Sequence, residues 1–296
     1  MPVTLSILYR GPLSSCNYDC HYCPFAKRHE TAAELKTDRL ALERLVDWIK
    51  TRTGDSLSLF FTPWGEALTR RWYQAAICEL TRLEQVEKVA AQTNLSYDLD
   101  WIENANTSRL ALWCTFHPSQ TTRARFLSQS RRLTELGVAH SVGSVGLPED
   151  LEEIERLRAE LPDDIYLWVN AAKSSNVDYQ GELLERFTAI DPLFELNTQY
   201  HASLGRSCRC GSSVISVDGA GEIYRCHFIK QRLGNLYEPG FEVCLTDRPC
   251  TNQTCGCHIG YVHLDDLKLY PVFQEGILER IPVEIQSGPE NSFPVA

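Results

Sequence analysis

Long apolar runs, an export signal and an excess of basic residues are all missing from this sequence. No stretch reaches the ~18 consecutive apolar residues of a membrane-spanning helix, so no membrane association is expected. The first residues, MPVTLSILYRG, lack the basic segment, apolar core and cleavage site of a signal peptide, which predicts a cytoplasmic protein. Against 39 Asp and Glu there are 29 Lys and Arg, a net charge of −10. Nucleic acids select basic surfaces, so nucleic acid is not an expected partner.

Methionine occurs once in the chain, whereas cysteine occurs twelve times. Three cysteines lie at positions 16, 20 and 23, and seven lie between 208 and 257. Cys78 and Cys114 lie between the two groups, in a helix-like and a strand-like run, and are predicted to be small core residues. In a chain that is not exported, grouped cysteines indicate a metal site or catalysis rather than disulfides.

Strand-like and helix-like apolar patterns alternate along the first two thirds of the chain. The predicted strands are 3–9, 57–62, 88–93, 110–116, 140–145 and 165–169. The predicted helices are 38–51, 70–85, a short one at 99–105, 121–136, 149–160 and 180–189. Six such units predict an α/β fold with a parallel sheet, either an open six-stranded sheet or a partial barrel. In both architectures the ligand site lies at the carboxyl ends of the strands.

The alternation stops near Asp191. Residues 195–207 are predicted to be a linker, and 212–226 a β-hairpin that turns at 218–221. Cysteine-rich loops follow, and the final segment, 287–296, is predicted to be frayed. The expected division is a barrel at 1–194, a small cysteine-rich domain at 195–270 and a C-terminal tail at 271–296.

The loop after the first predicted strand carries the first cysteine group. It reads CNYDCHYC from Cys16 to Cys23, with the spacing C-x3-C-x2-C. Three thiolates on one short loop suit a [4Fe–4S] cluster that leaves one iron open, because structural zinc sites usually take four protein ligands. The alternatives are a zinc site completed by His21 or His29, and three unrelated cysteines.

This motif, followed by the strand–helix alternation, resembles the radical SAM (S-adenosylmethionine) enzymes over nearly the whole chain. Their signature is C-x3-C-x-aromatic-C after the first strand of a partial (β/α)6 TIM-like barrel, and Tyr22 takes the aromatic place. The resemblance implies that Cys16, Cys20 and Cys23 hold three irons of a [4Fe–4S] cluster. It also implies that S-adenosylmethionine binds the fourth iron and that Tyr22 borders the adenine.

Segments at later strand ends resemble further cofactor contacts of this family. TPWGEAL, 62–68, is similar to the G-G-E-P segment that holds the methionine amino group, although Trp64 replaces the first Gly and Ala67 the Pro. The Q-T-N segment at 92–94 resembles the family's T-N segment, and 143–146 is similar to a glycine-bearing adenine contact. The implied cofactor-binding residues are Tyr22, Gly65, Glu66, Thr93, Asn94, Thr115, His117 and Asn170. A solvated loop acid is the alternative for Glu66, a structural role is the alternative for His117, and Lys173 is interpreted as a surface charge.

The second cysteine group resembles the SPASM/twitch extension of radical SAM enzymes. Cys208 and Cys226 flank the predicted hairpin, and the L-G-N-L segment at 233–236 is typical of that extension. The chain then has C-x4-C-x-C where the full SPASM form has C-x2-C-x5-C-x3-C, which favours one auxiliary [4Fe–4S] cluster. Its implied ligands are Cys208 and Cys226 with two of Cys250, Cys255 and Cys257. The roles of Cys210 and Cys244 stay open, and a structural zinc site in these loops is the alternative.

The resemblance implies an oxidoreductase or maturase-type enzyme. A reductant such as flavodoxin or ferredoxin would supply one electron, S-adenosylmethionine would be cleaved, and a 5′-deoxyadenosyl radical would take hydrogen from the substrate. That substrate is a peptide side chain or a small metabolite, with a slight preference for a metabolite because the chain starts close to its first strand. No acid–base pair is assigned. The alternative function is a zinc-stabilised, cysteine-rich binding module without catalysis.

Overall fold

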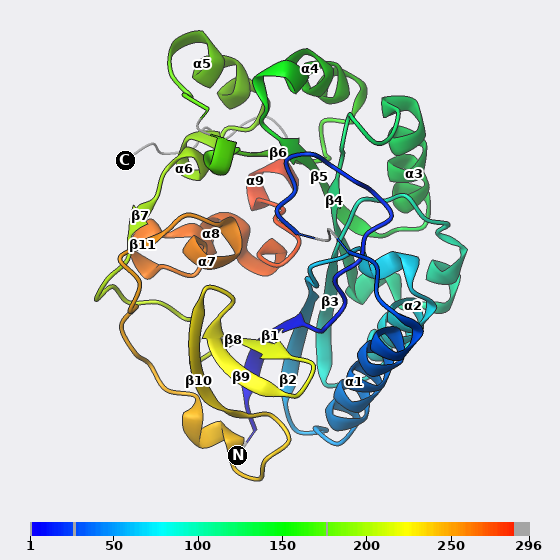
Figure 1. Cartoon of the computed structure of the whole chain (residues 1–296), viewed down its shortest axis with the longest axis vertical. Coiled ribbons are helices and arrows are strands. Elements are labelled where there is room, and N and C mark those ends of the chain that lie inside the picture. The colour runs from blue at the N-terminus through cyan, green and yellow to red at the C-terminus, as the bar shows by residue number, and fades with distance from the viewer. Residues whose placement is uncertain (1, 26–27, 176, 287–296) are drawn as a thin grey trace.

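The computed structural model describes residues 2–25, 28–175 and 177–286 (Figure 1). Its first six strands are β1 (Thr4–Arg10), β2 (Ser56–Phe61), β3 (Val86–Thr93), β4 (Leu110–Thr115), β5 (Ala139–Val145) and β6 (Leu167–Asn170). The helices between and after them are α1 (Ala32–Lys50), α2 (Arg71–Leu80), α3 (Arg123–Glu135), α4 (Leu151–Glu160), α5 (Gly181–Ile190) and α6 (Phe194–Thr198). Short 3-10 helices are η1 (Ala67–Thr69), η2 (Asp100–Asn104), η3 (Thr107–Arg109), η4 (Pro148–Asp150), η5 (Lys173–Ser175), η6 (Phe241–Cys244), η7 (Asp265–Leu267) and η8 (Gln274–Gly276).

The later part of the chain adds three strands to the same sheet. These are β8 (Val214–Asp218), β9 (Glu222–Cys226) and β10 (Ile229–Asn235), and the sheet order is β10-β9-β8-β1-β2-β3-β4-β5-β6. β1 to β6 are parallel neighbours, and β8 runs parallel to β1, with Ser6 opposite Val214. A two-stranded sheet pairs β7 (His201–Ala202) with β11 (Thr254–Cys255), and α7 (His258–Tyr261), α8 (Leu269–Phe273) and α9 (Val283–Gln286) complete the described chain. The predicted α/β fold is thus confirmed.

Helix α1 begins six residues before the predicted start at 38 because of a capping box. The Thr31 hydroxyl accepts the Glu34 N–H, and the Glu34 carboxylate accepts the Thr31 N–H at 2.8 Å. Two of the N–H groups that a helix start leaves without partners are satisfied in this way. The sequence contains this T-x-x-E capping signal at 31–34. The helix was predicted from its stripe of apolar residues instead, and that stripe begins later in the chain.

One face of the sheet is covered by the helices that connect its strands. Outward-facing residues such as Ile7, Leu59 and Leu112 pack with Leu45 of α1 and Ile77 of α2 in the larger of two apolar cores. The helices surround this face in Figure 1. A parallel sheet needs such a cover on each face, because its strands are apolar on both sides.

The C-terminal segment covers the other face of the sheet. Alternate strand residues, among them Leu8, Phe60 and Trp113, pack with Ile259 and Phe273 in a second core that also contains four buried cysteines. Helices α7 and α8 lie against this face in Figure 1, opposite the connecting helices. The predicted tail at 271–296 begins inside α8, and its described part, 271–286, contributes buried side chains such as Leu278.

A buried ion pair anchors this C-terminal segment to the sheet. Arg280 and Asp191 are 1% and 0% exposed, and their Nη2 and Oδ2 atoms are 3.7 Å apart. The Arg280 guanidinium also donates to the Asn170 side chain at 2.9 Å and lies 5.0 Å from the centroid of Trp168. Asp191 accepts further hydrogen bonds from the Tyr166 hydroxyl and the Val169 N–H. The edge strand β6 is therefore tied to residue 280 by charge and by packing.

Other predicted elements differ in detail. The helix expected at 99–105 is the 3-10 helix η2, and the expected linker at 195–207 contains α6 and β7. The predicted hairpin is present as β8–β9 and is extended by β10. The frayed end predicted for 287–296 lies outside the described residues, and the domain boundaries stay predictions. No helix in the described part of the chain has the length and apolar character needed to cross a membrane.

Replacing Arg280 by Met should reduce the free energy of unfolding by about 3–5 kcal/mol, because it leaves the buried Asp191 carboxylate without its cation. Urea denaturation followed by circular dichroism measures the change. Arg156→Met is the matched control, since Arg156 pairs with Glu152 on an exposed surface and should change stability by less than about 0.5 kcal/mol. A loss below about 1 kcal/mol for Arg280→Met would show that the pair does not anchor the segment.

Candidate functional site

One face of the sheet packs against the C-terminal segment. On this inner face, polar side chains replace apolar ones at the carboxyl ends of the strands. Side chains two residues apart on a strand point the same way. Leu8, Phe60 and Trp113 are the last residues of β1, β2 and β4 whose side chains belong to the second core. Two residues further along each chain segment, on the same face, lie Arg10, Thr62 and Thr115. Gln92 and Asn170 hold the equivalent positions on β3 and β6, and the Thr62 hydroxyl donates to the Gln92 side chain at 2.5 Å. The strand ends therefore present a polar layer above an apolar floor.

The first cysteine group lies on the loop that leaves β1 at this polar layer. The Cys16 sulfur accepts the Tyr18 N–H at 3.4 Å and the Asn94 side-chain amide at 3.7 Å. Burial, together with the charges of Glu66, Cys20 and Cys23, raises the pKa of Cys16 to about 11. The Cys23 N–H donates a hydrogen bond to the Cys20 carbonyl at 3.1 Å, which makes a tight turn between these two cysteines. The N–H donors aimed at sulfur favour a thiolate, while the neighbouring thiols oppose a second negative charge.

Gly65 permits the close approach of two loops beside Cys16. The Glu66 N–H donates to the Ser15 carbonyl at 3.0 Å, and the Gly65 N–H donates to the Leu13 carbonyl at 3.3 Å. A Cβ atom at Gly65 would lie 1.9 Å from the Ser15 carbonyl oxygen, which is impossible without a backbone shift. Glycine at 65 is therefore required by the crossing of the β1 and β2 loops.

Glu66 is a buried carboxylate that joins the ends of β2 and β3. It accepts the Thr93 hydroxyl at 2.8 Å, the Asn94 N–H at 2.6 Å and the Leu68 N–H at 3.1 Å. Burial raises its pKa to about 7, against the effect of these hydrogen bonds. The alternative of a solvated loop acid is therefore wrong, because the side chain is 5% exposed.

Tyr22 and His117 form a pair on the other side of the loop. The Tyr22 hydroxyl lies 2.7 Å from the His117 Nδ1 atom, and the rings stack with centroids 6.0 Å apart. Burial lowers the pKa of His117 to about 4, so the imidazole is neutral at pH 7. Thr115 ends β4 opposite Gly143, and Asn170 ends β6, where its side-chain oxygen accepts from Arg280. The predicted cofactor residues thus form two groups around the cysteine loop, one at Glu66 and one at His117.

The second cysteine group gathers around β9 and the loop before α7. Burial is the largest cause that raises the pKa of Cys255 to about 12, and the neighbouring thiols Cys226, Cys257, Cys250 and Cys208 contribute to the same shift. Cys210 donates a hydrogen bond to Cys208, which lowers the pKa of Cys208. Cys244 lies elsewhere, with its sulfur beside Gly234, and the charges acting on it are those of Arg248 and Glu242.

Cys257 has a different environment from the other members of this group. Burial raises the pKa of its thiol, whereas the positive charges of Arg10, Lys173 and Arg280 lower it. Sequence reasoning missed Arg10 and Arg280, and it named Lys173 only as a surface charge. Arg10 could have been found from its inward position two residues after Leu8, whereas no local signal distinguishes Arg280. Lys173 is half-buried and donates to the Gln199 carbonyl at 3.0 Å, so its interpretation as a surface charge was wrong.

One cavity of about 620 Å³ connects the two cysteine groups. At one end it is lined by Tyr22, Cys23 and His117, and at the other by cysteines of the second group. These cysteines are Cys208, Cys210, Cys226, Cys250, Cys255 and Cys257. Asn170 and Lys173 lie on the wall between them. Reactive groups held at the two ends would therefore share one cavity.

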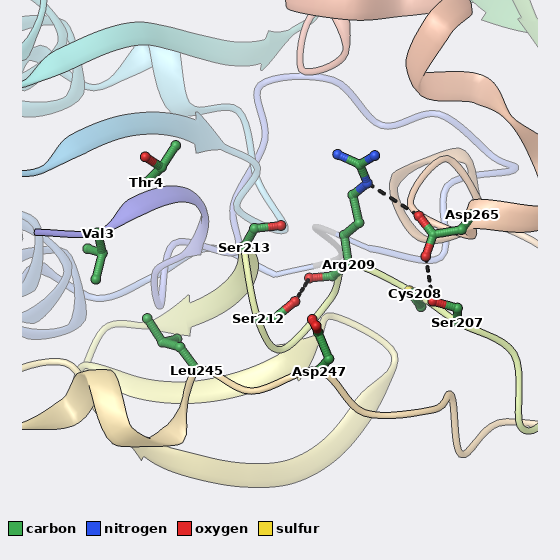
Figure 2. A pocket seen from close by; sticks show the side chains of 10 residues that line it. All are labelled: Val3, Thr4, Ser207, Cys208, Arg209, Ser212, Ser213, Leu245, Asp247 and Asp265. Atoms are coloured by element: carbon green, nitrogen blue, oxygen red, sulfur yellow. Dashed lines mark hydrogen bonds and ion pairs between the residues drawn. The ribbon is translucent and has the colours of Figure 1, made fainter.

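A second hollow lies on the far side of Cys208 (Figure 2). It measures about 480 Å³ and is polar, and the Arg209 guanidinium within it pairs with Asp265 at 3.3 Å. Cys208 lines both this hollow and the inner cavity.

The thiols of the first cysteine group are the donor type that iron–sulfur clusters bind. Within the described residues no three Cys, His, Asp or Glu side chains converge as ligands of a single metal ion. The fit therefore rests on three thiols of one loop, on the N–H donors to Cys16 and on the narrow crossing at Gly65. Thiolates with N–H···S hydrogen bonds are the usual ligands of such clusters.

Comparison with known proteins identifies the fold. No protein-family model matches the chain, and no curated protein does. The solved structure of native anSMEcpe with bound AdoMet and Kp18Cys peptide aligns with a TM-score of 0.53 over 97% of this chain and 100% of that chain, at 14% identity. The same enzyme with Cp18Cys peptide aligns with a TM-score of 0.51 over 82% of each chain, at 14% identity. These neighbours are radical SAM enzymes, so the expected partial-barrel fold is confirmed, whereas the SPASM extension stays a prediction.

Glu66 predicts a specific pH dependence of stability in protein without cofactor. A carboxyl whose pKa is raised on folding, here from 4.5 to about 7, stabilises the fold fully below pH 4.5 and loses that contribution as pH rises to 7. Between pH 4.5 and 8 the wild type should therefore lose about 3 kcal/mol relative to Glu66→Gln, at 1.36 kcal/mol per pKa unit. Urea denaturation across this range measures it, with the exposed Glu149→Gln as the control. Parallel pH profiles for wild type and Glu66→Gln would contradict the buried-carboxylate assignment.

Proposed function

We propose that this protein is a radical SAM enzyme whose Cys16, Cys20 and Cys23 hold a [4Fe–4S] cluster that binds S-adenosylmethionine. The observation that carries the proposal is the position of the C-x3-C-x2-C loop. It leaves β1 at the strand ends of a fold shared with AdoMet-bound enzymes, and it opens into the inner cavity. Held there and reduced by one electron, the cluster would supply the electron that breaks the sulfur–C5′ bond of S-adenosylmethionine, giving methionine and a 5′-deoxyadenosyl radical that takes hydrogen from a substrate.

Residues of this chain would orient the cofactor from both sides of the loop. Glu66 is the partner for the methionine ammonium, because a buried carboxylate gains most from a cation beside it. Tyr22 and His117 form the wall for the adenosine end, where a neutral imidazole donates or accepts hydrogen bonds without adding charge. The floor of the cavity is apolar, and it would exclude water from a radical.

We further propose one auxiliary [4Fe–4S] cluster held by Cys208, Cys226, Cys250 and Cys255. Cys226 and Cys255 are each influenced by the charges of Cys208 and Cys250. Cys257 also acts on Cys255, but it alone has three cations, Arg10, Lys173 and Arg280, acting on its own thiol. Cys210 contacts Cys208 and would hydrogen-bond to it as a thiol. Four cysteines leave no open iron, so this cluster would pass electrons and would not bind substrate. A flavodoxin or ferredoxin as reductant and a cytoplasmic location stay predictions.

Replacing Cys16, Cys20 and Cys23 together by Ala should abolish the dithionite-driven formation of 5′-deoxyadenosine, because no ligands then remain for the first cluster. Chromatography of the anaerobic reaction measures the product. Cys78→Ala should keep wild-type formation, since Cys78 lies on α2 with its thiol donating to the Trp101 carbonyl. Product from the triple variant would locate cleavage at another cluster. A colourless wild-type protein that purifies anaerobically with zinc would instead support the zinc-stabilised binding module.

Cys208→Ala and Cys226→Ala should each lower iron from about eight to about four atoms per chain, counting four per cubane. Cleavage of S-adenosylmethionine should survive in both variants because the first cluster is untouched. The matched control is Cys244→Ala, which should keep about eight irons because its sulfur lies beside Gly234, away from the group. Iron analysis of anaerobically reconstituted protein decides the matter. Equal iron loss in Cys244→Ala would contradict the ligand assignment.

A further inference from the structure

The described side chains that line the inner cavity include cations but no carboxylates. The protein carries a net charge of −10, yet none of the described residues that line this cavity is an Asp or a Glu. Two of the lining residues are cations, Arg225 and Lys173. Arg225 is 1% exposed and donates to the carbonyls of Arg248 and Pro249, so its guanidinium already has partners in the loop before Cys250.

Lys173 is the cation that remains available to a ligand. Its ammonium donates to the carbonyls of Asn197 and Gln199, which leaves one of its three N–H groups. No carboxylate pairs with it among the ion pairs formed within the described residues. The centroid of the Tyr200 ring lies 5.3 Å from the Lys173 Nζ atom, a neutral partner that does not balance the charge. A carboxylate entering the cavity would form an ion pair with this ammonium.

Aromatic side chains surround the opening of the same cavity. Phe25, Tyr200 and Phe228 line it and are 45%, 61% and 43% exposed. Trp64 packs on Phe25 with ring centroids 4.4 Å apart and widens this rim. Exposed aromatic groups at a cavity mouth bind the parts of a ligand that extend beyond the cavity. A metabolite enclosed by the cavity would leave this rim unused, whereas a peptide would cover it.

We infer that the substrate is a peptide with an acidic side chain, whose carboxylate is bound by Lys173 while the rim of Phe25, Trp64, Tyr200 and Phe228 holds the flanking residues. This inference rests on the proposed function, because it names the substrate of the proposed cavity. The charge of Lys173 makes the site selective, since a neutral amide of the same shape would leave the ammonium without a counter-charge.

The test uses two dansyl-labelled nonapeptides that are identical except for a central Glu or Gln, flanked by Gly and Phe. Fluorescence anisotropy measures their affinity for the anaerobically reconstituted enzyme with S-adenosylmethionine. The Glu peptide should bind wild type about ten- to a hundredfold more tightly than the Gln peptide, as expected for a hydrogen bond between charged groups. Lys173→Met should remove this preference, Lys173→Arg should keep most of it, and the exposed Lys230→Met should leave it unchanged. Phe228→Ala should weaken both peptides equally.

Several results would overturn the inference. Equal affinity of the two peptides, absence of binding, or a Glu preference that survives in Lys173→Met would each remove Lys173 from substrate recognition. N-acetylglutamate binding as tightly as the Glu peptide would replace the peptide by a small acid. A Lys173→Met variant that keeps the preference but shifts an iron–sulfur reduction potential would assign the lysine to the auxiliary cluster. Selective peptide binding without any 5′-deoxyadenosine would refute the proposed function alone, and 5′-deoxyadenosine formation without selective binding would refute this inference alone.

Discussion

The need to cover both faces of a parallel sheet determines how this molecule is built. Helices cover one face, and the chain after α6 must cover the other, because Phe60, Trp113 and Trp168 would otherwise remain in water. The segment that does so is also the segment that carries the second cysteine group. Cys208, Cys210, Cys226 and Cys250 are members of that inner core and not of a separate appendage. Folding of the sheet therefore also brings these cysteines together.

The cysteine loop after β1 is held in place mainly by main-chain contacts and one buried carboxylate. The Gly65–Ser15 crossing fixes the distance between the loops after β1 and β2. Glu66 then ties the loop after β2 to the end of β3 through Thr93 and Asn94, and Asn94 donates to Cys16. Three loops of very different sequence thus share one junction. A junction of this kind is what a site needs in order to direct a reactive intermediate to one bond.

Local patterns in the sequence were sufficient for the strands, the helices and the cysteine loop, because each depends on neighbouring residues. The apolar runs predicted all six parallel strands, and the C-x3-C-x2-C spacing identified the loop at their carboxyl ends. The pairing of β8 with β1 joins residues about 200 positions apart, and no local pattern encodes it. The same applies to Arg280, whose role depends on Asp191 and Asn170. Lys173 was misinterpreted because a lysine in a polar loop has the same local signature whether it faces solvent or a cavity.

The parallel pairing of β8 with β1 has a consequence for any attempt to shorten this protein. A fragment that ended near residue 194 would lack β8 to β10, and β1 would become the outermost strand of the sheet. Its N–H and C=O groups, now bonded to Val214 through Asp218, would form an open hydrogen-bonding edge along TLSILYR. Unprotected edges of this kind recruit other chains and lead to aggregation. The hairpin therefore serves as a terminating cap for the sheet, and solubility of the barrel half depends on it.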